Sequence, residues 1–126
     1  MFEPGLQSAK IKLSEIAHAR SGDKGNHANV GVIAYSQAGF EYLGEILTAE
    51  RVADYFAEMQ PAKVERFELP GIYAYNFLLY EVLGGGASRS LRVDTQGKTL
   101  AIMLLEMRIP KPAGIDQMTR TASSFS

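Results

Sequence analysis

The chain has 126 residues, 46% hydrophobic and 21% charged, with a formal net charge of -1. This length fits one domain, and a chain so close to neutral gives no reason to expect nucleic acid or a membrane surface as its partner. Because cysteine is absent, disulfides, thiolate metal sites and a cysteine nucleophile are excluded.

The ends of the sequence differ in composition from the middle. The start, MFEPGLQSAK, lacks the pattern of a signal peptide, and no stretch is apolar for long enough to form a membrane helix. We therefore expect a cytoplasmic protein with a terminal extension at 1–9 and a domain at 10–109. Residues 110–126 are small and polar after two prolines, so we expect this tail to leave the packed domain.

The first half of the domain is expected to contain two strands and a helix. Apolar and polar residues alternate over 11–17, and 29–36 is a short β-branched run, so each predicts a strand. The segment between them, HARSGDKGNHAN at 18–29, is then a connecting loop. A helix is predicted over 49–59, where Thr48 is the N-cap and Pro61 follows the end.

The second half is expected to add a strand, a helix and a hairpin. A strand over 63–69 stops at Pro70-Gly71. The apolar segment 72–83 ends in three glycines and predicts a buried helix. Strands are predicted over 88–93 and 98–109, joined by a turn with Gly97.

The resulting order is ββαβαββ. It predicts an α+β protein, a ferredoxin-like two-layer sandwich in which two helices cover one face of a mainly antiparallel sheet. Within 98–109 the stretch LAIMLLEM is apolar at both strand parities. Either a second copy or a larger partner covers the outer face, or Ala101 and Met103 are tolerated exposures.

The 18–29 segment is the first candidate site. Gly22 and Gly25 allow close approach of backbone amides to a ligand, and Arg20 and Lys24 add positive charge, so an anion is the natural ligand. The pattern is not a P-loop. The competing interpretation is a structured turn without a ligand, because Asp, Asn and Gly also build such turns.

Catalytic chemistry is only weakly indicated. Asp23 beside Lys24 could act as an acid and base pair, and His18 or His27 could carry a proton, but no ordered nucleophile, base and orienting group is evident. The two histidines lack a metal-ligand spacing. We expect no metal and no cofactor.

A second candidate site is GGGASRS at 84–90. Its glycine backbone, its two hydroxyls and the Arg89 guanidinium could hold a carboxylate or phosphate, and the alternative is a helix C-cap followed by a linker. Asn76 stands in an apolar segment, where it is either a satisfied core amide or a brace for a nearby loop.

These motifs resemble those of a known family. ARSGDKGNHANVGVIAYS, YNF and LGGGASRSLRVDTQGK are similar to the carboxy-terminal ferredoxin-fold domain of the acyclic terpene utilisation protein A (AtuA) family, over about residues 10 to 107. Members carry a large amino-terminal domain before it, so the resemblance implies that the small domain stands alone here. The family is associated with bacterial breakdown of acyclic terpenoids through acyl-CoA intermediates.

The resemblance implies ligand-binding residues and partners. The expected ligand-binding residues are Arg20, Ser21, Gly22, Asp23, Lys24, Gly25, Asn26, Asn29, Asn76, Gly85, Gly86, Ser88 and Arg89. The expected ligand is an acidic small molecule or an acyl-CoA. The expected protein partner is a second copy of the chain or a separately encoded AtuA-like large chain.

Three functions fit these observations. The first is an accessory or binding subunit with an anion site built from SGDKGN and GGGASRS. The second is an independent hydrolase or lyase acting on an acyl or carboxylate compound, with Asp23 or His18 as base and Lys24 and Arg89 stabilising charge. It requires the two motifs to converge in space. The third is a purely structural dimerisation module.

Overall fold

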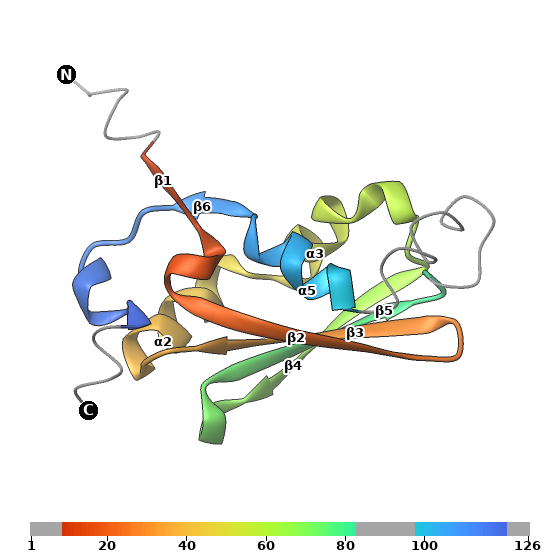
Figure 1. Ribbon diagram of the computed structural model, residues 1–126, viewed down its shortest axis with the longest axis horizontal. Coiled ribbons are helices and arrows are strands. Elements are labelled where there is room, and N and C mark those ends of the chain that lie inside the picture. The colour runs from red at the N-terminus through yellow and green to blue at the C-terminus, as the bar shows by residue number, and fades with distance from the viewer. Residues whose placement is uncertain (1–8, 83–97, 121–126) are drawn as a thin grey trace.

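The computed structural model describes residues 9–82 and 98–120. Within these ranges, four antiparallel strands form the main sheet in the order β2-β3-β5-β4 (Figure 1). Their bounds are Ala17–Lys24 for β2, His27–Ala34 for β3, Lys63–Leu69 for β4 and Ala74–Tyr80 for β5. A second, smaller sheet pairs β1 (Lys10–Lys12) with β6 (Arg108–Pro110).

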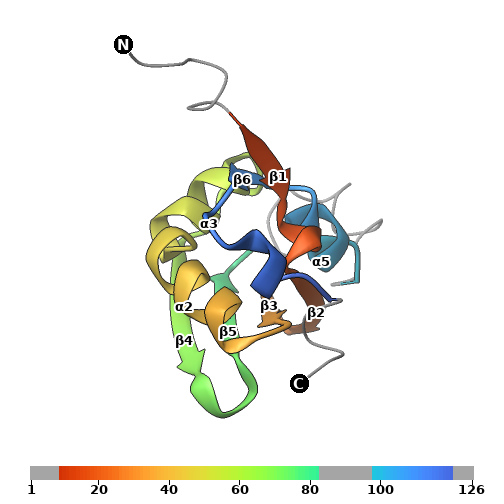
Figure 2. The ribbon, with the colours of Figure 1, turned by 90° about the vertical axis from the view of Figure 1, so that its left-hand side faces the viewer.

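The helices lie along one face of the main sheet, and the β1–β6 pair lies on the same side (Figures 1 and 2). The α-helices are α2 (Gln37–Ile46), α3 (Ala49–Tyr55) and α5 (Lys98–Leu105). Short 3-10 turns are η1 (Leu13–Glu15), η2 (Ala57–Met59), η3 (Pro70–Ile72) and η4 (Ile115–Gln117). No helix in the described ranges is long and apolar enough to cross a membrane.

Strand alternation separates a buried face of the sheet from an open one. On β3 the residues Ala28, Val30, Val32 and Ala34 are buried beneath the helices, whereas the residues between them are only half-buried. On β5, Tyr75, Phe77 and Leu79 join the same core. The opposite side of β3 and β5, which we call the open face, is covered by none of the helices in the described ranges.

Several sequence predictions are confirmed. The protein is an α+β protein with antiparallel sheets, and the strands predicted over 29–36 and 63–69 correspond to β3 and β4. The helix predicted over 49–59 begins as expected, because the Thr48 hydroxyl accepts a hydrogen bond from the Arg51 amide at 3.0 Å. Its regular part ends at Tyr55, and a 3-10 turn follows.

The prediction of a buried helix over 72–83 is wrong. This segment contains β5, which is paired on both sides by β3 and β4. A central strand whose open face is half-buried carries apolar residues on both of its faces. Such a short apolar run does not alternate, so its periodicity does not distinguish it from a buried helix. The aromatic residues of AYNFLLY favour a strand.

The prediction of a strand over 98–109 is also wrong. Residues Lys98–Leu105 form α5, and only Arg108–Pro110 is extended. Ala, Leu and Met are strong helix formers, which explains the outcome. Leu100, Ala101 and Leu104 are buried, Met103 packs against the core, and Ile102 is exposed. The apolar strand that suggested a covering partner therefore does not exist in this form.

The first strand and the 18–29 loop were both misplaced. Residues 11–17 divide into β1, η1 and the start of β2. Residues 18–29 are not a loop but most of a β-hairpin, in which β2 and β3 pair from Ala17↔Ala34 to Lys24↔His27. Only Gly25 and Asn26 form the turn, and Gly25 has a φ of 64°, which a tight hairpin turn with glycine at its first central position requires.

The structure also differs from the sequence predictions in the number of helices and in the carboxy-terminal tail. The helix α2 was not predicted, so the described chain holds three α-helices rather than two. The tail does not leave the packed domain entirely, because Met118 is buried in the core and the Ser36 hydroxyl donates to the Gln117 carbonyl at 2.7 Å. The strand predicted over 88–93 and the turn over 94–97 lie outside the described residues.

Candidate functional site

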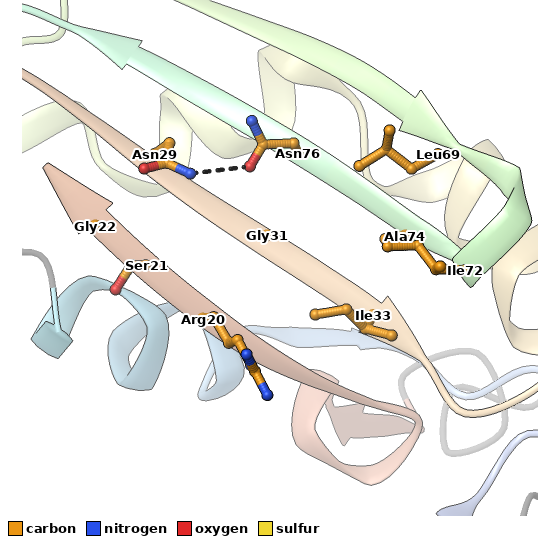
Figure 3. Close-up of a pocket in the computed structure, with 10 residues that line it drawn as sticks. All are labelled: Arg20, Ser21, Gly22, Asn29, Gly31, Ile33, Leu69, Ile72, Ala74 and Asn76. Atoms are coloured by element: carbon orange, nitrogen blue, oxygen red, sulfur yellow. Dashed lines mark hydrogen bonds between the residues drawn. The ribbon is translucent and has the colours of Figure 1, made fainter. Parts of the chain in front are cut away.

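The open face carries a shallow pocket of about 280 Å³ over β2, β3 and β5. Figure 3 shows a polar end around Asn29 and Asn76 and an apolar end around Ile33, Leu69 and Ile72. The lining residues are Arg20, Ser21, Gly22, Asn29, Gly31, Ile33, Leu69, Ile72, Ala74 and Asn76. The pocket therefore suits a molecule that has both a polar and an apolar part.

Two asparagines form the polar end. The side-chain Nδ2 of Asn29 on β3 donates to Oδ1 of Asn76 on β5 at 3.2 Å, and both residues are half-buried. The sequence left two interpretations of Asn76, a satisfied core amide or a brace for a nearby loop. Its contact with Asn29 joins two adjacent strands rather than a strand and a loop.

Two glycines form the floor beside this pair. Gly22 lies opposite Asn29 in the β2–β3 register, and Gly31 lies opposite Asn76 in the β3–β5 register. A Cβ at Gly22 would lie 3.3 Å from the Asn29 Oδ1, and a Cβ at Gly31 would lie 3.7 Å from the Asn76 Oδ1. Glycine weakens a central strand and often marks close approach by a ligand, so Gly31 is the clearest structural sign of a site.

Arg20 supplies the positive charge. It lies on β2 at the edge of the pocket, and its guanidinium has no hydrogen bond or ion pair to any residue in the described ranges. An unpaired guanidinium can hold a carboxylate through two parallel hydrogen bonds. Arg20 and Arg120 both lower the pKa of His18, so the positive charges of both guanidinium groups act on this part of the protein.

The pKa of His18 lies below its ordinary value, first because burial penalises the charged ring and then because of Arg20 and Arg120. We expect Arg20→Gln to raise this pKa part of the way back, since the burial remains. An NMR titration of the His18 ring measures it. Arg108→Gln removes an equal charge outside the pocket and should leave the His18 pKa unchanged.

The same shift sets the sign of a pH dependence. The folded state binds the His18 proton less readily than the unfolded state, so the stabilisation by neutral His18 is complete above about pH 6.5 and falls as the pH drops towards the folded pKa. His18 is exposed, which makes the effect small. In His18→Gln this part of the pH dependence of unfolding should disappear, and an unchanged profile would contradict the assignment.

The hairpin divides Arg20 and the SGDKGN residues that follow it between the two faces of the sheet. Arg20 and Gly22 reach the open face, whereas Ser21 turns to the helix side, where its hydroxyl accepts a hydrogen bond from the Ala101 amide at 3.2 Å. Ser21 thus anchors the first part of α5. Three other residues of the motif are exposed at or near the hairpin tip and do not line the pocket: Asp23, Gly25 and Asn26. The backbone of Lys24 also lies at the hairpin tip.

The catalytic candidates are not brought together. His18 stacks on Tyr35, with ring centroids 5.6 Å apart. The His18 side chain points to the open face of β2, whereas the Asp23 side chain points to the opposite face. The two side chains therefore cannot share a proton. His27 is engaged elsewhere, because its Nδ1 accepts a hydrogen bond from the Glu81 amide at 2.9 Å.

The second candidate motif cannot be placed. Gly85, Gly86, Ser88 and Arg89 lie outside the described residues, so the convergence of GGGASRS with the hairpin stays a prediction. No cluster of three or more potential metal ligands occurs within 9–82 and 98–120.

Sequence reasoning missed the non-polar lining of the pocket. Gly31 lies within a predicted strand, and Ile33, Leu69, Ile72 and Ala74 come from β3, from β5 and from the end of β4 with its following turn. The available signal was Gly31, a glycine inside a β-branched run. The apolar residues gave no signal, because only strand pairing brings them together.

An antiparallel main sheet with helices on one face and a glycine-floored pocket on the other defines a small α+β domain. Residues 11–110 match the family model of the AtuA ferredoxin-like domain, and the chain belongs to that family. The expected resemblance is thereby confirmed. No curated protein and no solved structure matches the chain.

Proposed function

We propose that the protein is an accessory or binding subunit whose open face binds a small organic acid or its acyl derivative. The observation that carries the proposal is the Arg20 guanidinium, which has no hydrogen bond or ion pair to any described residue and lies beside a pocket floored by Gly22 and Gly31. The context that the family implies is acyl and terpenoid catabolism, in which acids and CoA-linked acids are the natural ligands.

Binding is favoured over catalysis by the arrangement of the polar groups. Within the described part of the chain, the side chains that give the pocket its polar character are one charged group, Arg20, and two neutral amides. His18 and Asp23 lie on opposite faces of β2. Acid and base catalysis requires two groups within hydrogen-bond reach of the same reacting atom. The hydrolase or lyase alternative therefore depends on residues beyond the described ranges.

Calorimetric titration with hexanoate tests the proposal. A charge-assisted hydrogen bond contributes about 1.5–3 kcal/mol, so Arg20→Gln should weaken binding by about tenfold or more. Gly31→Ala fits the backbone but raises the floor of the pocket, and it should also weaken binding. Arg108→Gln is the charge-matched control and should bind like the unaltered protein. If the affinity for hexanoate is unchanged in both Arg20→Gln and Gly31→Ala, the proposed site is wrong.

A protein partner is also part of the proposal. Phe67, Leu69 and Ile72 are 45%, 44% and 60% exposed at the β4 edge and the following turn. Exposed apolar residues grouped in this way are typical of interaction surfaces. The expected partner is a second copy or a separately encoded large chain of the family. Analytical ultracentrifugation of the protein, alone and mixed with the large chain, distinguishes a homodimer from a complex of the two chains. A protein that stays monomeric and does not bind the large chain would contradict both expectations.

A further inference from the structure

The amide pair leaves one amino group and one carbonyl group without a partner in the described residues. The bond from Asn29 to Asn76 uses the Nδ2 of the first and the Oδ1 of the second. The Asn29 Oδ1 and the Asn76 Nδ2 have no partner among residues 9–82 and 98–120. If both amides were turned round, one carbonyl and one amino group would still be open, because a single amide-to-amide bond always leaves one of each.

This pattern selects among polar groups. A carboxylate or a fully ionised phosphate only accepts hydrogen bonds, and an ammonium group only donates them. A hydroxyl donates one hydrogen bond and accepts others, so it can satisfy both open amide atoms at once. Water reaches these half-buried atoms, so a bound molecule that displaces it must replace its hydrogen bonds to avoid a loss of free energy. A hydroxyl does so at both atoms, which gives the pocket a preference for such a group.

The surroundings define the rest of the molecule. Among residues 9–82 and 98–120, Arg20 is the single charged side chain that lines the pocket, which matches one carboxylate better than a doubly charged phosphate. Ile33, Leu69 and Ile72 form the opposite end and offer an apolar contact for an aliphatic chain (Figure 3). A volume of about 280 Å³ corresponds to about nine water molecules at roughly 30 Å³ each.

We infer that the ligand is a hydroxycarboxylic acid with a short aliphatic chain. Its carboxylate binds Arg20, its hydroxyl lies between the Asn29 Oδ1 and the Asn76 Nδ2, and its chain contacts Ile33 and Leu69. The inference rests on the proposed function, because it specifies the ligand class of the same pocket. It adds the hydroxyl, which the carboxylate site alone does not require.

The test compares 3-hydroxyhexanoate with hexanoate on the full chain, with inorganic phosphate as a third probe. Calorimetry gives the dissociation constants, and NMR follows the side-chain amide signals of Asn29 and Asn76. A neutral hydrogen bond contributes about 1 kcal/mol, so the hydroxy acid should bind about fivefold tighter than hexanoate. Its titration should move both amide signals.

Variants locate the hydroxyl. Asn76→Ala should bring the two dissociation constants together. Gln37→Ala removes an exposed amide of α2, on the helix side of the sheet, and should keep the preference. Thermal unfolding checks that each variant is folded, and the comparison of the two acids on the unaltered chain needs no variant. Equal binding of the two acids would overturn this inference and leave the proposed function standing. Binding of neither acid, or tighter binding of phosphate, would overturn both.

Discussion

Replacing Phe77 by alanine should lower the free energy of unfolding by about 3–5 kcal/mol. Phe77 lies in β5 between β3 and β4, its side chain is fully buried, and it packs within the main core. Loss of the ring removes its transfer free energy from the folded state and leaves a cavity that paired strands on both sides cannot close. Urea unfolding followed by circular dichroism measures the change.

The matched control is Phe67→Ala. Phe67 lies in the neighbouring strand β4, but its side chain points to the open face and is 45% exposed. This substitution should cost less than about 1 kcal/mol, since little apolar surface is lost from the core. Similar losses for the two variants would contradict the division of the sheet into a buried and an open face.

Gly44→Ala should destabilise the protein by about 1–3 kcal/mol, although alanine normally favours a helix over glycine by about 1 kcal/mol. A Cβ at Gly44 in α2 would overlap the Tyr75 hydroxyl oxygen. Tyr75 cannot easily move, because it is buried, its hydroxyl donates to the Phe40 carbonyl at 2.8 Å and its ring stacks on Phe40. The free energy of unfolding again measures the effect.

A double-mutant cycle supplies the control. In the Tyr75→Phe background the clashing oxygen is gone, and the added Cβ would meet a ring carbon at an ordinary 3.4 Å. Tyr75→Phe alone should cost about 1 kcal/mol for the lost hydrogen bond. Gly44→Ala should then be neutral or stabilising in that background. A Gly44→Ala variant that stabilises the unaltered protein would show that this packing is wrong.

Local signals explain which elements could be predicted. Thr48 with Pro61 bounds the α3 region, and the β-branched run after Asn29 marks β3, because each signal lies within the element itself. The helix α2 was missed because Gly39 and Gly44 interrupt its pattern, although Ser36 caps it with a bond of 3.1 Å to the Gly39 amide. The strand β5 and the helix α5 were exchanged because both are apolar in most directions.

The candidate site was predictable in part for the same reason. Arg20, Gly22 and Asn29 lie within one hairpin, so a local motif carried them. Asn76 was singled out as a lone amide, but its contact with Asn29 depends on the pairing of β3 with β5, which spans 47 residues. The apolar end of the pocket depends on that same pairing and on the turn after β4. Composition and spacing do not determine such a register.

The short pair of β1 and β6 joins the first described strand of the chain to the last one. Lys10 lies opposite Pro110, and the Lys111 amide donates to the Ala9 carbonyl at 3.2 Å. This pair lies on the helix side of the main sheet, away from the open face (Figure 2). After β6 the chain returns to the core, where Met118 is buried. Protein joined ahead of β1 therefore starts on the side opposite the pocket and does not disturb the main sheet. A fluorescent protein attached at the amino terminus should leave ligand affinity unchanged.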